Sequence, residues 1–334
     1  MAKYSGAQFA LFLVDAYNLI VHLSESASMG KEEITQQTNP FGVTSEQHTP
    51  VGLEKGTLAV GGGIFDSTTD ALHDVAPGST RVSRTISAAI EGNTIGKHFM
   101  GFEGPIDSKY EVTDKRDGLT MANVNYLVSG AVDEGVIIQH LASFTADWQT
   151  KTGGANAVDA PVDYVADVGQ RRFGMASASK AAASVITMKT QHGSPIVHGL
   201  TSGQLVFISG NSLAAPAING QQTVTVLSTT TFSVPVDTTL STGAGTDGTF
   251  VLASTVAGGV GYLHCTAFAP TSLVPKIMHS PDDITYAALI TFTTLTAVGK
   301  ERKTVTGTVD RYLAFDGDHT GAGSVTVFSG FCRN

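Results

Sequence analysis

The sequence predicts a mainly β protein, and two observations carry this prediction. Short runs in which apolar and polar residues alternate recur through most of the chain, and clusters of turn-forming residues, including many of the 37 glycines, separate them. With 334 residues, 42% of them hydrophobic, the chain can bury more than one core. We expect three units: a β-sandwich or barrel domain with one short helix over residues 1–175, a small β-module over 176–254 and a C-terminal β-sandwich over 255–334.

The first unit begins over Phe9–Val21 with either a strand pair or a single strand that bends at residues 15–18. Residues 35–63 contain prolines, glycines and few apolar residues, so they predict a long loop. Asp66 can cap a helix that Pro77-Gly78 stops, which predicts a short helix over residues 66–75. Further strands of this unit are expected at 81–90, 95–103, 109–113, 119–130 and 135–145.

The second unit carries almost no charge and consists of strand-like runs. Within it, Ile218-Asn219-Gly220 lies between two such runs and predicts a hairpin turn. The third unit has evenly spaced strand-like runs separated by turns, a spacing that is typical of a sandwich. Its strands are expected at 260–268, 273–278, 286–293, 303–315 and 323–331.

The charge is sparse and unevenly placed. Only 15% of the residues are charged, against about 25% in soluble proteins generally, which favours a chain that buries much surface against copies of itself. Residues 1–175 carry 12 Lys and Arg against 21 Asp and Glu, so the whole net charge of −9 lies there. Because nucleic-acid binding depends on cations, this balance argues against a DNA-gripping role. Two interpretations stay open: ordinary solubilising charge, and a surface past which DNA slides without binding.

Membrane insertion and a disulfide framework are not expected. No stretch approaches the roughly 18 apolar residues of a membrane helix, and Asp15 interrupts the apolar run near the N-terminus, which makes a poor signal peptide. Two cysteines are too few for a disulfide framework or a zinc site. Cys265 and Cys332 are therefore interpreted as reduced core thiols, with a single bridge between them as the alternative.

Motifs for catalysis or for a bound cofactor are also lacking. Gly243-Ala244-Gly245-Thr246-Asp247-Gly248 matches the dinucleotide pattern, but a strand-like run follows it where that pattern needs a helix. His192 and His198 flank a loop without further ligands, and the acidic turns at Asp282-Asp283 and Asp316-Gly317-Asp318 offer too few oxygens for calcium. We expect no enzyme activity, no cofactor and no metal.

Four stretches of the third unit are familiar. These are Gly261–Ala267, Val274–Asp283, Thr306–Leu313 and Val325–Phe331, and together they resemble the C-terminal pattern of tail tube (major tail) proteins of long-tailed bacteriophages. In the second unit, His198–Gly203, Ile218–Gly220 and Thr230–Ser233 look like a small β-module of phage structural proteins. The first unit is similar to tube-forming domains in the order of its elements.

The resemblance implies a homo-oligomeric ring of six subunits whose first units join strands into one β-barrel around a channel, with rings stacked into a tube. The implied partners are further copies of the chain and other tail proteins (tape measure, terminator and distal tail), with DNA only in transit and no membrane. The implied location is the virion tail, after assembly in the host cytoplasm. A ring of three duplicated domains is the alternative, but the chain shows no internal repeat.

Candidate site residues follow from this layout. Acidic residues in or between the strands after the helix are predicted to line the channel: Glu91, Glu103, Asp107, Glu111, Asp114 and Asp117. Apolar residues of the long loop are predicted to be buried where rings stack: Phe41, Val51 and Leu53. Solvated outer loops for the first set, and an unattached loop for the second, are the alternatives.

A second function is a β-rich adhesin or carbohydrate-binding decoration of the virion. Sugar sites usually present aromatic rings, and the single tryptophan, Trp148, lies outside the second and third units. A binder of this kind should stay a small oligomer, whereas a tube protein should form rings or filaments.

Overall fold

The computed structural model confirms a mainly β fold, with α1 (Leu72–Val75) as the one α-helix of the described residues. No helix in that part of the chain has the length and apolar character needed to cross a membrane. The described residues are 9–37, 48–75, 83–114, 118–128, 130–149, 162–163, 173–191, 194–195, 197–198, 200–212, 218–241, 243–246, 248–252, 254–255, 258–281 and 285–333.

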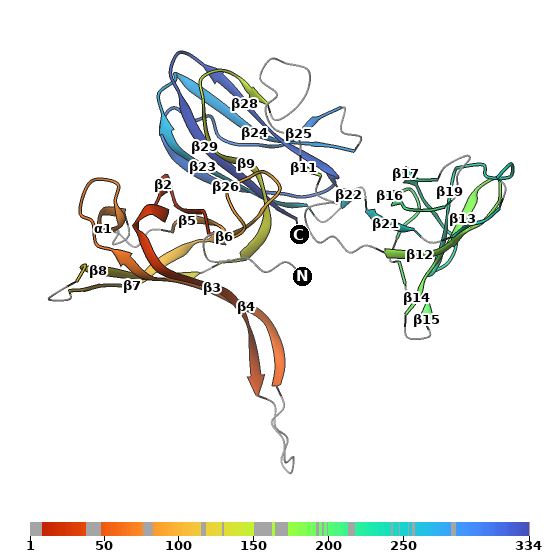
Figure 1. Ribbon diagram of the computed structural model, residues 1–334, viewed down its shortest axis with the longest axis horizontal. Helices are drawn as coiled ribbons and strands as arrows, with labels where there is room; N and C mark the ends of the chain where they lie inside the picture. The colour runs from red at the N-terminus through yellow and green to blue at the C-terminus, as the bar shows by residue number, and fades with distance from the viewer. Residues whose placement is uncertain are drawn as a thin grey trace, which may run out of the picture.

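An antiparallel eight-stranded sheet forms the body of the molecule (Figure 1). Its order is β2-β1-β5-β6-β9-β29-β23-β26. The bounds are β1 (Leu11–Val14), β2 (Tyr17–Asn18), β5 (Thr85–Ala89), β6 (His98–Glu103), β9 (Val132–Phe144), β23 (Gly259–Phe268), β26 (Gly299–Val305) and β29 (Val325–Arg333). Because β9 pairs with β29, the predicted first and third units contribute strands to this one sheet and are not separate in the structure.

The eight-stranded sheet curls, so that β26 contacts β5 although β6, β9, β29 and β23 lie between them in the strand order. The inner face of the curl holds one apolar cluster, in which Leu13 of β1, Phe99 of β6 and Tyr262 of β23 meet. The rings of Phe99 and Tyr262 pack edge to face with centroids 5.7 Å apart. Residues two apart along each strand therefore point into the curl, and those between them point outward.

Two smaller sheets cover the outer face. A four-stranded sheet, β3-β4-β8-β7, packs against β1, β5 and β6, and a five-stranded sheet packs against β9, β23 and β29. The first contains β3 (Leu23–Gln37), β4 (His48–Ile64), β7 (Pro105–Thr113) and β8 (Met121–Val128). The second contains β10 (Trp148–Gln149), β11 (Val162–Asp163), β24 (Ser272–Ser280), β25 (Ala287–Thr291) and β28 (Tyr312–Thr320).

Residues 173–252 form a separate module with its own core, which includes Met175, Ile186, Phe232 and Phe250. Its strands are β12 (Phe173–Ala178), β13 (Ser184–Met188), β14 (Thr190–Gln191), β15 (Ser194–Pro195), β16 (Leu205–Ser209), β17 (Gly220–Thr223), β18 (Thr225–Val226), β19 (Thr231–Val234), β20 (Gly245–Thr246) and β21 (Thr249–Leu252). The module stands beside the body, joined to it through β22 (Ser254–Thr255), which pairs with β27 (Val309–Asp310) (Figure 1).

Three local predictions were wrong. Residues 48–63 are not loop but belong to β4, which pairs with β3 along the whole of its length. The helix is shorter than predicted because Asp66 accepts hydrogen bonds from Thr68 in a turn, and Asp70 has a φ of 68°, which a helix cannot contain. The hairpin between β16 and β17 closes through residues 210–219, so Asn219-Gly220 ends a longer loop.

Other predictions agree with the structure more closely. Phe9–Val21 contains the predicted strand pair, β1 and β2, with Asp15 in the turn. The strand predicted at 303–315 is divided among β26, β27 and β28 by a turn at Gly307, whose φ is 95°. Cys265 and Cys332 are free and buried, so they do not bridge.

A glycine at the junction of β9 and β29 tests this packing. A Cβ at Gly135 would lie 2.2 Å from the carbonyl oxygen of Phe331, so Gly135→Ala forces the two strands apart. We expect a loss of about 1–3 kcal/mol of unfolding free energy, measured by urea denaturation. Gly30→Ala is the matched control, since its Cβ meets nothing closer than 3.7 Å, and it should change stability by about 0.5 kcal/mol or less. Equal stabilities of the two variants would contradict the shared sheet.

Candidate functional site

The four-stranded sheet has one buried and one open face. Leu58 and Val60 of β4 lie opposite Tyr126 and Val124 of β8, and these side chains pack into the core beneath the sheet. Their neighbours along each strand point the other way, because successive side chains of a strand alternate between its faces. The sheet therefore presents a complete second face to solvent.

Most of the exposed side chains described on that open face are small or polar, and Leu127, 50% exposed, is the apolar exception. Thr57 lies opposite Leu127, and Asn125 lies opposite Lys109, all of them exposed. The charged groups there are Lys109 and Glu111, whose side chains form an ion pair of 2.6 Å. Over its described central part the open face is thus nearly neutral.

Both edges of this sheet end without a further strand. In the described part of the chain, β3 and β7 each pair on one side only. Such edges offer rows of free N–H and C=O groups, which soluble proteins usually keep short or charged. The edges of the eight-stranded sheet follow that rule, since β2 has two residues and β26 contains four consecutive charged residues, Lys300 to Lys303. The edges β3 and β7 also contain charged residues, but with 15 and nine residues they are not short.

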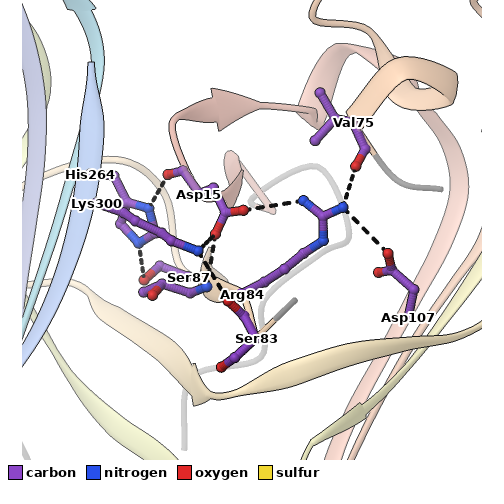
Figure 2. Close-up of polar contacts among 9 residues, drawn as sticks. Asp15, Val75, Ser83, Arg84, Ser87, Asp107, His264 and Lys300 are labelled. Carbon is purple, nitrogen blue, oxygen red and sulfur yellow. Dashed lines mark hydrogen bonds and ion pairs between the residues drawn. The ribbon is translucent and has the colours of Figure 1, made fainter. Parts of the chain in front are cut away.

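The four-stranded sheet is tied to the body by a buried ionic network (Figure 2). Arg84, 7% exposed, donates to the carboxylates of Asp15 (3.1 Å) and Asp107 (3.3 Å) and to the carbonyl oxygen of Val75 (2.6 Å). Asp107 belongs to β7, so Arg84 connects the edge strand to the turn that follows β1. Lys300 of β26 reaches Asp15 from the other side.

His264 completes this network from inside the curl (Figure 2). Its Nδ1 lies 2.6 Å from the carbonyl oxygen of Asp15 and its Nε2 lies 2.8 Å from Oγ of Ser87. A carbonyl can only accept, so Nδ1 carries the proton and Nε2 accepts from the serine hydroxyl. The neutral ring is fully satisfied, and burial lowers the pKa of His264 to about 4.

A second ionic cluster forms around Arg302, two residues along β26 from Lys300. Arg302 donates to Asp133 of β9 at 2.9 Å and to Glu103 of β6 at 2.9 Å. The hydroxyl of Tyr262 donates to the same Asp133 carboxylate at 2.5 Å. Burial raises the pKa of that hydroxyl, so it stays protonated and remains a donor. Lys300 and Arg302 together hold the edge strand β26 against strands across the curl.

The predicted channel residues do not form one group. Asp107 and Glu103 are partners of Arg84 and Arg302, and Glu91 lies 2.8 Å from Nδ1 of His98. Asp114 accepts a hydrogen bond from Thr120 in the loop between β7 and β8. Of the six, Glu111 alone lies on the open face of the sheet among described residues. Asp117 lies outside the described residues.

Two of the three predicted stacking residues fall on the hairpin of β3 and β4. Val51 and Leu53 are in β4, and Leu53 lies opposite Ile34 in the register. Phe41 lies outside the described residues. Beyond Gly56, where pairing with β8 ends, residues 32–37 and 48–55 continue as a two-stranded arm that projects past the body (Figure 1).

The remaining candidate motifs serve the fold. Residues 245–246 and 249–252 of the dinucleotide-like segment are strands β20 and β21. His198 accepts from the N–H of Leu200 and contacts the carbonyl oxygen of Ser228, and Lys276 pairs with both Asp316 and Asp318. The described residues contain no cluster of three or more groups able to hold a metal ion.

Sequence patterns do not single out Arg84, His264 or Lys300, because their partners lie far away along the chain. Arg84 is 69 residues from Asp15, and Lys300 is 285 residues from it. One feature of the sequence did point to His264. It follows Val260 and Tyr262 at a spacing of two residues, so the strand places this titratable ring on the same inward face.

No family model matches the chain, and no curated protein matches it. Among solved structures, the chain is similar to the Dit protein (gp 19.1) of phage SPP1, described as a paradigm of the hub adsorption apparatus in phages that infect Gram-positive bacteria. The two are 10% identical over 96% of this chain and 98% of that one, with a TM-score of 0.28. This TM-score is too low to establish a common fold, so the function is argued from the chain's own residues.

The buried histidine predicts acid sensitivity. The pKa of His264 is lowered from 6.5 to about 4, so between these values the unfolded chain binds a proton that the folded one does not. Stability should therefore fall as the pH drops from about 6.5 to 4, with the unfolding constant rising up to tenfold per pH unit from this group. Denaturant titrations at several pH values measure it, and His264→Asn, which keeps a donor towards Asp15, should flatten the slope. A His264 NMR titration with a midpoint near 6.5 would contradict the prediction.

Proposed function

We propose that this protein is a structural component of a phage virion that polymerises as stacked rings into the tail tube, with the four-stranded sheet as the wall. The observation that carries the proposal is the pair of long, open edges on a sheet whose second face is polar. Joining β3 of one protomer to β7 of the next removes both edges and closes a barrel. The tail tube resemblance of residues 261–331 supports the same arrangement.

Ring order follows from barrel geometry. With strands about 4.8 Å apart and tilted by about 40°, six four-stranded sheets close a barrel about 48 Å across between backbones. Three such sheets give about 24 Å, and inward side chains about 5 Å deep on each side leave that channel too narrow for duplex DNA. A channel for DNA therefore favours six protomers over three.

The core beneath the sheet decides which face lines the channel. Since Leu58, Val60 and Val124 are packed against the body, the open face with Thr57, Asn125 and the Lys109–Glu111 pair must point inward. We expect DNA to slide past because a face with a single compensated cation gives phosphates little to bind. Of the acidic residues predicted to line the channel, Glu111 is the one that lies on this face among the described residues.

The arm is the proposed stacking element. Residues 32–37 extend about 20 Å beyond the sheet, and a two-stranded ribbon is only marginally stable alone in water. Docking onto the adjacent ring would supply its missing support. Other tail proteins would then meet the two ends of the tube, as the resemblance implies.

Negative-stain electron microscopy of the purified chain over a concentration series tests the proposal. We expect rings that join into hollow tubes as the concentration rises, because ring-on-ring contacts are head-to-tail. Compact particles of one size at every concentration would overturn the tube and favour the decoration or adhesin function.

Crosslinking tests which edges meet. Ser28→Cys in β3 combined with Lys109→Cys in β7 should give ladders of linked protomers with a short bismaleimide, because both positions are exposed. The native cysteines, Cys265 and Cys332, are buried and should not react with the bismaleimide. Ser28→Cys with Thr225→Cys, an exposed module position, is the matched control and should not produce ladders. Ladders of equal yield from both pairs would contradict the edge-to-edge joint.

A further inference from the structure

The module is attached to the body at one short stretch, residues 309–313, which we name the docking segment. β22, directly after the module's last strand, pairs with it through Ser254↔Asp310 and Thr255↔Val309. β11, which precedes the module in the chain, pairs with it through Val162↔Leu313 and Asp163↔Tyr312. The segments that precede and follow the module in the chain therefore both pair with the docking segment.

The docking segment is held firmly by the body. Arg333 of β29 donates to three successive carbonyl oxygens, at 2.8 Å to Val309, at 3.4 Å to Arg311, and also to Asp310 between them. His279 of β24 accepts from the N–H of Asp310 at 3.2 Å. A backbone fixed at this many points presents the Arg311 side chain in a defined direction.

Arg311 makes the contact with the module. Its guanidinium carbon lies 3.6 Å from the ring centroid of Phe207 in β16 and 4.9 Å from that of Tyr312, and the residue is 7% exposed. In β16 the neighbours Val206 and Ile208 belong to the module core, whereas Phe207 does not. Phe207 therefore faces away from that core, towards the body.

We infer that Arg311 is a latch that holds the module in one orientation on the body, by seating its guanidinium on Phe207. The two flanking pairings are only two residues long and would by themselves leave a hinge. A desolvated cation over an aromatic face adds a third, directional contact, which joins the docking segment to β16 of the module itself. The module is then an oriented part of each protomer rather than a tethered appendage, whether or not the protomers form a tube.

Arginine is required for this role. Its guanidinium is planar and can lie flat on a ring, whereas the ammonium of lysine is a strongly hydrated point charge. Arg311→Lys keeps the charge and should lose the latch. Phe207→Leu removes the ring from the other side and should leave the module folded, because Phe207 is not part of its core.

Distances between spin labels test the latch directly. Labels at Thr229→Cys in the module and Thr320→Cys in β28, both exposed, report on the angle between the two parts by electron paramagnetic resonance. The protein with Arg311 should give one narrow distance distribution. Arg311→Lys and Phe207→Leu should each broaden it at least twofold, while thermal unfolding shows that both parts remain folded.

Lys303→Ala, which removes an exposed cation of β26 outside the docking segment, is the matched control and should leave the distribution narrow. Distributions that stay narrow in both latch variants would overturn the inference. If one variant does not fold, the other decides. Because the readout is the shape of a single protomer, it is independent of whether electron microscopy finds tubes.

Discussion

The structure depends on one set of ion pairs, which holds the curled eight-stranded sheet closed. The eight-stranded sheet curls until its edge strand β26 faces strands from its other end, and Lys300 and Arg302 bridge the gap to Asp15, Glu103 and Asp133. Charges withdrawn from water are costly unless they are paired, and here each of the two half-buried cations meets a carboxylate from another part of the curl. The same contacts fix Asp15, and through Arg84 they fix β7, so the closure of the body also sets the position of the sheet that we propose as a tube wall.

Strand length and charge pairing distinguish the edge strand β26 from the edges of the four-stranded sheet. In β26 the charged residues alternate between the inside of the curl and the outside, where Lys303 donates to the carbonyl oxygen of Thr291. The charged side chains of this edge strand are therefore already engaged in contacts within the protomer. The strands β3 and β7 are longer, and the exposed ion pair described in them, Lys109–Glu111, lies within β7. These longer edges are the ones through which we propose that protomers assemble.

Much of the fold could be predicted from the sequence, because strand periodicity and turn residues are local signals. The strands around Met121–Val128 and Gly259–Phe268 and the bend at Asp15 belong to this class. The arm was missed because glycines and threonines form a strand only when a neighbour supplies the pairing, as β3 does for β4. The ion-pair partners of the predicted channel carboxylates could not be foreseen for a related reason: the arginine that neutralises Glu103, Arg302, lies far away along the chain.

The position of β29 between β9 and β23 has a consequence for the order of folding. During synthesis all strands of the module exist before β23, β26 and β29 are made, so the module's short-range pairings can form while the body still lacks its central strands. Until β29 and β26 emerge, β9 is paired only with β6 and Asp15 has no lysine partner. The ion pair that ties Asp15 to the closed body thus forms late in synthesis, which would delay the proposed polymerisation until β26 is made.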